Sequence, residues 1–90
     1  MQQFNLFGEY KVLCSIDPAR NRYRVYRLSL VKKADQTFSV ERKWGRLATD
    51  EKGALYIGKK EAVYSEYSKA QMQFLNLLRQ KKRKGYVEKD

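Results

Sequence analysis

One five-residue segment, 42–46 (Arg-Lys-Trp-Gly-Arg), carries the most informative side chains of the sequence. The indole ring of Trp44 can stack on a sugar or a base while the cations around it, Arg42, Lys43 and Arg46, hold phosphates. Gly45 has no side chain and would let the backbone of another molecule approach closely. A lone tryptophan in a small domain is more often part of the core, so two interpretations of Trp44 stay open.

Two basic clusters accompany this segment. Residues 20–46 hold nine Lys and Arg against two acids, and five of the six residues 79–84 are basic. Beyond Trp44 and Gly45, the candidate contacts to a nucleic-acid backbone are Arg42, Lys43, Arg46, Asn21, Arg22, Arg24, Lys82, Lys84 and Tyr86. A solvated face, or favourable charge at a helix end, explains such clusters as well.

The composition narrows the function classes. The chain has 90 residues, a net charge of +10 and 42% hydrophobic residues, which indicates one small folded domain matched to a polyanion: nucleic acid first, an anionic membrane surface second. The single cysteine and the absence of histidine exclude an internal disulfide, a zinc site and a Ser–His or Cys–His site.

The distribution of acidic residues and the length of the apolar runs exclude further classes of function. The carboxylates are scattered, so no catalytic dyad is indicated. We therefore expect no enzymatic activity, no metal, no cofactor and no small-molecule substrate, with a metal-dependent nuclease as the one enzymatic option left. No apolar run is long enough to span a membrane, which predicts a cytoplasmic protein, free or associated with the nucleoid, without a membrane partner.

The strand pattern comes first along the chain. Alternation predicts a strand over 10–16, a turn that begins at Asp17-Pro18, and a second strand over 23–31 with Tyr26, Leu28 and Leu30 on one face. A third strand from Thr37 places on one side the residues Phe38, Val40, Arg42, Trp44 and Arg46. A brief strand is expected over 54–57.

A helical stripe follows, formed by Val63, Tyr67, Ala70, Phe74, Leu77, Leu78 and Lys81 and ended by Gly85. The helix starts either near Lys60 or, with Ser65 as its N-cap, after a strand over 61–64. One helix cannot bury its own stripe. The pattern therefore predicts an α+β domain, a twisted antiparallel sheet with one long amphipathic helix packed on one face.

The triplet Trp44-Gly45-Arg46 resembles the signature of the WGR domain family. Residues 16–21 (Ile-Asp-Pro-Ala-Arg-Asn) with Val25-Tyr26, and the chain end over 81–88, are also similar to bacterial members. The resemblance spans about 13–88 and implies one domain over 10–88, between an N-terminal segment 1–9 and a tail 89–90. The chain departs from the family at Leu47-Ala48, where most members have Ile-Gly, and has a longer stretch over 49–60.

This resemblance implies a function. The family is known for DNA contact in poly(ADP-ribose) polymerases, where the tryptophan stacks on a sugar near a strand end and the arginine contacts the backbone there. Carried onto Trp44 and Arg46, it implies a non-enzymatic module that binds DNA, with RNA as an option, and a helix that starts between Ser65 and Tyr67. The alternative is a regulatory module that binds an acidic partner protein through the same face.

A second motif stands at the amino terminus. Residues 3–7 (Gln-Phe-Asn-Leu-Phe) resemble the peptides by which bacterial replication and repair proteins dock on the sliding clamp. In that case Leu6 and Phe7 would enter an apolar pocket and Gln3 would donate or accept a hydrogen bond. The alternative is that these apolar residues cover a sheet edge or the core.

Overall fold

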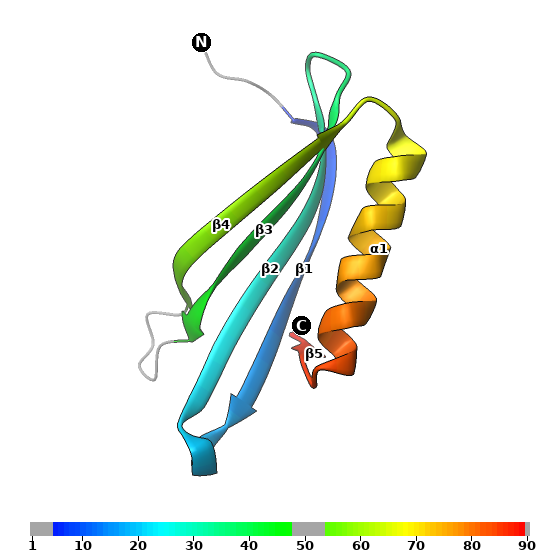
Figure 1. Cartoon of the computed structure of the whole chain (residues 1–90). Helices are drawn as coiled ribbons and strands as arrows, with labels where there is room; N and C mark the ends of the chain where they lie inside the picture. The colour runs from blue at the N-terminus through cyan, green and yellow to red at the C-terminus, as the bar shows by residue number, and fades with distance from the viewer. Residues whose placement is uncertain (1–4, 48–53, 90) are drawn as a thin grey trace.

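The computed structural model describes residues 5–47 and 54–89 of the chain (Figure 1). It contains one antiparallel sheet with the strand order β4-β3-β2-β1-β5, and one long helix. The elements are β1 (Asn5–Asp17), the 3-10 turn η1 (Pro18–Arg20), β2 (Arg22–Lys33), β3 (Phe38–Leu47), β4 (Ala54–Tyr64), α1 (Tyr67–Arg83) and β5 (Val87–Glu88). The predicted α+β class is confirmed.

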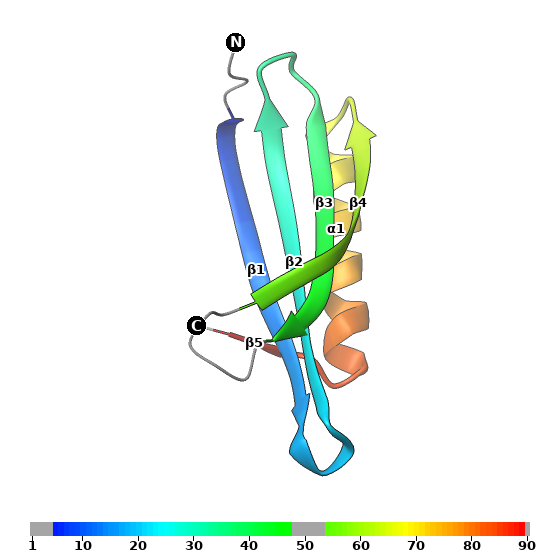
Figure 2. The same cartoon turned by 90° about the vertical axis from the view of Figure 1, so that its left-hand side faces the viewer.

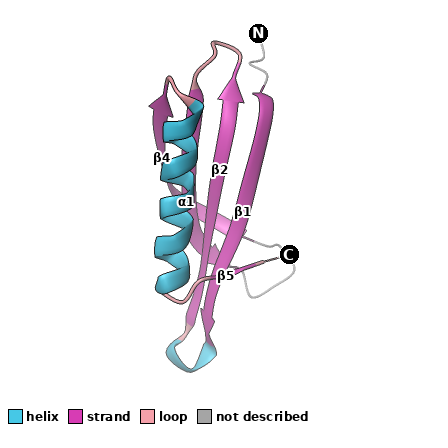
Figure 3. Cartoon of the chain, turned by 90° about the vertical axis from the view of Figure 1, so that its right-hand side faces the viewer, coloured by secondary structure: helices cyan, strands magenta, loops and turns pink. Residues whose placement is uncertain are grey.

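The core lies between the sheet and α1, which covers a single face of the strands (Figure 3). In β2, Tyr26, Leu28 and Leu30 alternate with residues of the other face, as predicted, and all three are buried. They meet Leu13, Val40, Ala70, Phe74 and Leu77 in one cluster. Each fully buried leucine stabilises the fold by about 2 kcal/mol through removal of apolar surface from water.

The β1–β2 hairpin reaches beyond the C-terminal end of α1 (Figure 1). The register pairs Tyr26 with Trp44 and Arg24 with Arg46. On the same side of β2 and β3 these residues follow the buried pair Leu30–Val40 and then the pair of buried Leu28 with half-buried Arg42. At this end of the sheet the helix stops short. The side of β3 that carries Val40, Arg42 and Trp44 therefore changes from core to surface along the strand.

Strand β4 differs from the prediction. The sequence predicts a brief strand over 54–57 and leaves 61–64 open, whereas the chain forms one strand from Ala54 to Tyr64 that crosses the sheet obliquely on the side away from α1 (Figure 2). Val63 belongs to β4 and is exposed, so its assignment to the helical stripe was wrong. Pairing with β3 and the β-branched side chain favour the strand here.

The ends of α1 are set by two short segments. The helix begins at Tyr67, within the start expected from the resemblance, but its N-cap is Glu66 without a side-chain cap hydrogen bond, so Ser65 is not the cap. Gly85 ends the helix with φ at 97°, and the Tyr86 N–H donates to the Lys81 carbonyl at 3.0 Å. This left-handed C-terminal turn sends the chain back into β5 beside β1.

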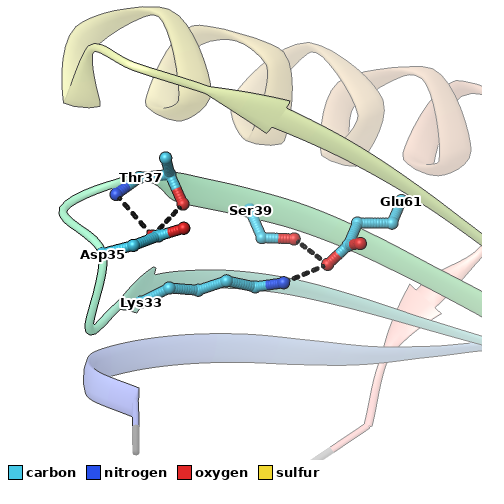
Figure 4. A network of polar contacts seen from close by, with 5 residues as sticks. All are labelled: Lys33, Asp35, Thr37, Ser39 and Glu61. Carbon is cyan, nitrogen blue, oxygen red and sulfur yellow. Dashed lines mark hydrogen bonds and ion pairs between the residues drawn. The ribbon is translucent and has the colours of Figure 1, made fainter. Parts of the chain in front are cut away.

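A polar network joins β2, β3 and β4 at the other end of the sheet (Figure 4). The Lys33 ammonium and the Ser39 hydroxyl both donate to Glu61 Oε2, at 2.9 and 2.5 Å. The Ser39 hydrogen bond, followed by the one from Lys33, lowers the pKa of the Glu61 carboxyl below its ordinary value. In the adjacent turn, Asp35 accepts the backbone N–H of Thr37 at 3.1 Å. Glu61 thus links β4 to β2 and β3, and Asp35 stabilises the turn between β2 and β3.

Candidate nucleic-acid interface

Trp44 lies at the surface, where β3 passes the end of α1. Its side chain is 38% exposed, which excludes the interpretation of Trp44 as a core residue. The indole ring packs against the backbone of Gly58 in β4: a Cβ atom at position 58 would lie only 2.6 Å from the Cζ2 atom of the ring. The ring is thus fixed in position while it remains in contact with solvent.

A hollow of about 450 Å³ opens beside this ring, and we call it the tryptophan hollow. Its lining residues come from β2, β3, β4 and the chain around the end of α1: Arg24, Val25, Tyr26, Arg42, Trp44, Gly45, Ile57, Lys81 and Tyr86. Three of these are cations, and none of the described lining residues is acidic. The hollow therefore combines aromatic surface with uncompensated positive charge, as a site for an anion requires.

Lys81 is a functional candidate that the sequence analysis did not select. Its ammonium lies 4.5 Å from the ring centroid of Tyr26 and 5.3 Å from that of Tyr86. Burial lowers the pKa of Lys81 below its ordinary value of 10.5, and Lys84, Arg42 and Arg24 lower it further. Two aromatic faces thus hold a cation among other cations. The sequence feature that could have identified Lys81 is its position within the otherwise apolar stripe of the helix.

The floor of the tryptophan hollow contains a buried hydroxyl group. Tyr26 is only 3% exposed, and its hydroxyl, which lies beside the Arg42 guanidinium, meets no acceptor among the described residues. Burial raises the pKa of Tyr26 above 10.0, and the neighbouring Arg42 guanidinium opposes this shift. A buried hydroxyl without an acceptor is costly, because it has given up its hydrogen bonds to water. The Arg42 guanidinium is the charged group that acts on this hydroxyl.

A second hollow of about 340 Å³, the arginine hollow, adjoins the first. It is lined by Arg20, Asn21, Arg22, Tyr23, Arg24, Gly45, Arg46 and Ile57. Asn21 has the left-handed conformation, with φ at 53° and ψ at 41°, which asparagine tolerates better than most residues. Its carboxamide oxygen accepts a hydrogen bond from Arg46 Nη2 at 3.1 Å. The Arg46 guanidinium carbon also lies 5.4 Å from the Tyr23 ring centroid, so Arg46 is oriented from two sides.

Gly45 lies between the two hollows and lines both. A Cβ atom there would lie 2.8 Å from the Leu55 carbonyl carbon and from Tyr56 Cα, and closer still to the Leu55 carbonyl oxygen. The backbone that approaches this glycine is therefore that of β4 in the same chain. This contact within the chain accounts for a glycine at position 45, and the approach of another molecule's backbone to Gly45 stays a prediction.

The remaining predicted residues lie elsewhere. Lys43 points to the other face and lines a third hollow, of about 380 Å³, together with Lys59. Lys82 donates to Glu88 Oε2 at 2.9 Å, so one carboxylate already holds it. Lys84 follows α1 and acts on the hollow through its charge on Lys81.

The amino-terminal motif falls largely outside the described part of the chain. Gln3 and the side chains of Leu6 and Phe7 are not among the described features, whereas the backbone is in β1 from Asn5 onward and Phe7 pairs with Lys32. Docking on a sliding clamp stays a prediction. Within residues 5–47 and 54–89, no three acids, cysteines or histidines gather as metal ligands, and no helix has the length and apolar character to cross a membrane.

The chain was compared with known proteins. The sequence model of the family described as WGR domain matches residues 10–90. A protein of Sinorhizobium fredii, called Uncharacterized protein y4dW, is 35% identical over 71 residues, which cover 79% of this chain and 32% of that protein. The alignment thus spans about a third of the length of the Sinorhizobium fredii protein. No solved structure matches this chain. WGR domains are nucleic-acid-binding modules of poly(ADP-ribose) polymerases.

Proposed function

The chain belongs to the WGR domain family, and from this premise we propose that it is a non-enzymatic module that binds DNA at strand ends or breaks. Trp44 stacks on a sugar in the tryptophan hollow, and the arginines on either side of it in β3 hold the backbone. The module acts in the cytoplasm, where bacterial DNA lies, and any catalysis belongs to a partner.

One observation carries this proposal: the tryptophan hollow brings the exposed Trp44 ring together with three cations, and none of its described lining residues is acidic. Arg24, Arg42 and Lys81 repel one another across the hollow, and no described acid of its lining neutralises them. An anion in the hollow would relieve this repulsion.

The spacing along β3 supports the assignment of roles. Arg42, Trp44 and Arg46 lie at alternate positions of one strand, so they point to one side at intervals of about 7 Å. Arg46 already donates to Asn21, which uses one of five guanidinium donors and fixes the orientation of the others. This row can place one sugar against the ring with backbone phosphates on both sides of it.

Salt dependence tests the proposal. Affinity for a short duplex, measured from the fluorescence of the sole tryptophan, should fall steeply with salt, with a logarithmic slope of about −0.9 for each phosphate contacted. Trp44→Ala, followed by anisotropy of labelled DNA, should weaken binding about tenfold or more, because stacking on an aromatic ring contributes about 1–3 kcal/mol. A flat salt response together with unchanged binding by Trp44→Ala would overturn the proposal.

A comparison of substrates separates the competing modes. Blunt, nicked, overhanging and single-stranded DNA, and RNA, are titrated at one fixed salt concentration. Preference for ends or nicks supports the proposed mode, whereas equal affinity for all of them reduces the site to a general cationic patch. Absence of binding at about 50 mM salt, where phosphate contacts are strongest, would instead favour an acidic protein as the partner of this face.

A further inference from the structure

Strand β4 contains a β-bulge opposite the consecutive residues Trp44 and Gly45 of β3. Gly58 pairs with Trp44 and Tyr56 pairs with Gly45, so Ile57 is an extra residue without a partner in β3. A bulge of this kind bends its strand and redirects one side chain. Here the redirected side chain is that of Ile57, which lines the tryptophan hollow, the arginine hollow and the third hollow beside Lys43.

Two close approaches hold the bulge in place. On one side the Leu55–Tyr56 backbone lies on Gly45, and on the other side Gly58 lies against the Trp44 ring. Neither glycine has room for a Cβ atom. The backbone of Ile57 is therefore fixed at both ends, and the side chain cannot withdraw from the surface by a local shift of β4.

The Ile57 side chain is 76% exposed, the largest value among the exposed large hydrophobic side chains of the described residues. Its surroundings are cationic: Arg24, Arg46 and Lys43 line the same hollows. A stiff apolar side chain in the middle of a positively charged surface does nothing for solubility and makes no core contact. Its position is explained by a ligand that is anionic and also presents flat apolar surface, and a nucleic acid with an accessible base face is such a ligand.

We infer that Ile57 is an apolar wedge that contacts the face of the terminal base while the sugar of that nucleotide stacks on Trp44. This inference rests on the proposed function and refines its substrate class. In an intact duplex, stacked neighbours cover the base faces and only the edges are accessible in the grooves. A wedge at this position therefore selects strand ends, nicks and frayed termini whose last base can be displaced from the stack.

The test uses the full 90-residue chain and a duplex with 2-aminopurine at its terminal position, with the same base at an internal position as reference. Displacement of the terminal base by the wild type should raise its fluorescence, and the internal base should not respond. Ile57→Ala should remove most of this rise. It should also reduce about tenfold the preference for linear ends over relaxed, covalently closed circular DNA.

Val63→Ala is the matched control, because Val63 is also β-branched, also exposed at 54%, and on the same strand but away from all three hollows. It should behave as the wild type, and Ile57→Val should retain most of the response. Thermal unfolding of Ile57→Ala should be unchanged, since the side chain is mostly solvated. If the wild type binds DNA with steep salt dependence but Ile57→Ala keeps the full fluorescence rise and end preference, the wedge is wrong. If the wild type binds no DNA at all, the proposed function itself fails.

Discussion

The indole ring of Trp44 lies directly against Gly58, close enough that any side chain at position 58 would displace the ring. The two residues pair across β3 and β4, next to the bulge at Ile57. The orientation of Trp44 therefore depends on a glycine fourteen positions away in the sequence. The pairing of β3 with β4 thus sets the position of the candidate nucleic-acid-binding ring.

Gly58→Ala should shift the Trp44 ring and weaken DNA binding about tenfold, because the added Cβ would lie 2.6 Å from the Cζ2 atom. The sole tryptophan makes the shift measurable as a change in emission maximum in the free protein. Gly8→Ala in β1 is the control: its nearest neighbour would be the Leu30 carbonyl oxygen at 3.5 Å, an ordinary contact. An unchanged emission spectrum in Gly58→Ala would contradict the packing described.

Gly45→Ala should act on stability rather than on the ring alone. The new methyl group would meet the β4 backbone at Leu55 and Tyr56, and backbone cannot rotate away as a side chain does. We expect a loss of about 3 kcal/mol in the free energy of unfolding, at the upper end of what overpacking costs. Urea denaturation followed by circular dichroism measures it, and a loss below about 1 kcal/mol would show that β4 can move aside.

Much of the fold could be predicted from local pattern. The alternation in β2 identified the face toward the helix, because Leu28 and Leu30 belong to the same core cluster as Phe74 and Leu77 of α1. The side of β3 that carries Val40 and Trp44 was also predicted correctly, since a strand keeps its two-residue period through a change from core to surface. Gly85 as the end of the helix followed from its tolerance of positive φ.

The parts that could not be predicted depend on long-range contacts. The sequence around Gly58 is typical of a turn, yet pairing with β3 carries β4 through it and produces the bulge at Ile57. Lys81 occupies an apolar position of the helix, and only the folded chain shows that Tyr26 and Tyr86 flank it. The contact of Gly45 with the backbone of Leu55 and Tyr56 could not be predicted either, because the crossing of β4 over β3 is a tertiary feature.

Asn21 has two roles that substitutions can distinguish: it adopts the left-handed backbone conformation, and its side chain accepts a hydrogen bond from Arg46. Asn21→Gly keeps the left-handed conformation but removes the carboxamide acceptor, so stability should stay near that of the wild type while DNA affinity falls a few-fold as Arg46 loses its orientation. Asn21→Ala should lose affinity and also about 1 kcal/mol of stability, because alanine keeps the Cβ but lacks the short polar side chain that lets asparagine tolerate positive φ. Equal DNA affinity of Asn21→Gly and the wild type would show that this hydrogen bond does not orient Arg46 for binding.

The Glu61 network predicts a component of acid sensitivity. Because the pKa of Glu61 is lowered in the folded protein, its contribution to stability is complete above the ordinary carboxyl value of 4.5 and is lost as the pH falls through the folded-state value. Glu61→Gln should thus lower the melting temperature near neutral pH and flatten its decline in acid. The contribution is small, since the side chain is partly exposed. Parallel melting curves of the variant and the wild type down to acidic pH would exclude this role.

Lys81 should make DNA binding sensitive to alkaline pH. In the free protein, burial and then Lys84, Arg42 and Arg24 lower its pKa below 10.5. A bound phosphate favours the charged ammonium and raises that pKa again, so binding takes up a proton between the free and bound values. Affinity should consequently fall as the pH rises from neutral toward 10.5, whereas burial raises the pKa of Tyr26 and so opposes ionisation of its hydroxyl over the same range.

Calorimetry in buffers of different ionisation enthalpy measures this proton uptake directly. Lys81→Arg should keep the affinity near neutral pH and abolish the alkaline decline, since a guanidinium does not titrate in this range. Lys82→Ala should keep the decline, because Lys82 is held by Glu88 and does not line the tryptophan hollow. Proton uptake that persists in Lys81→Arg would assign the titration to another group and remove Lys81 from the binding site.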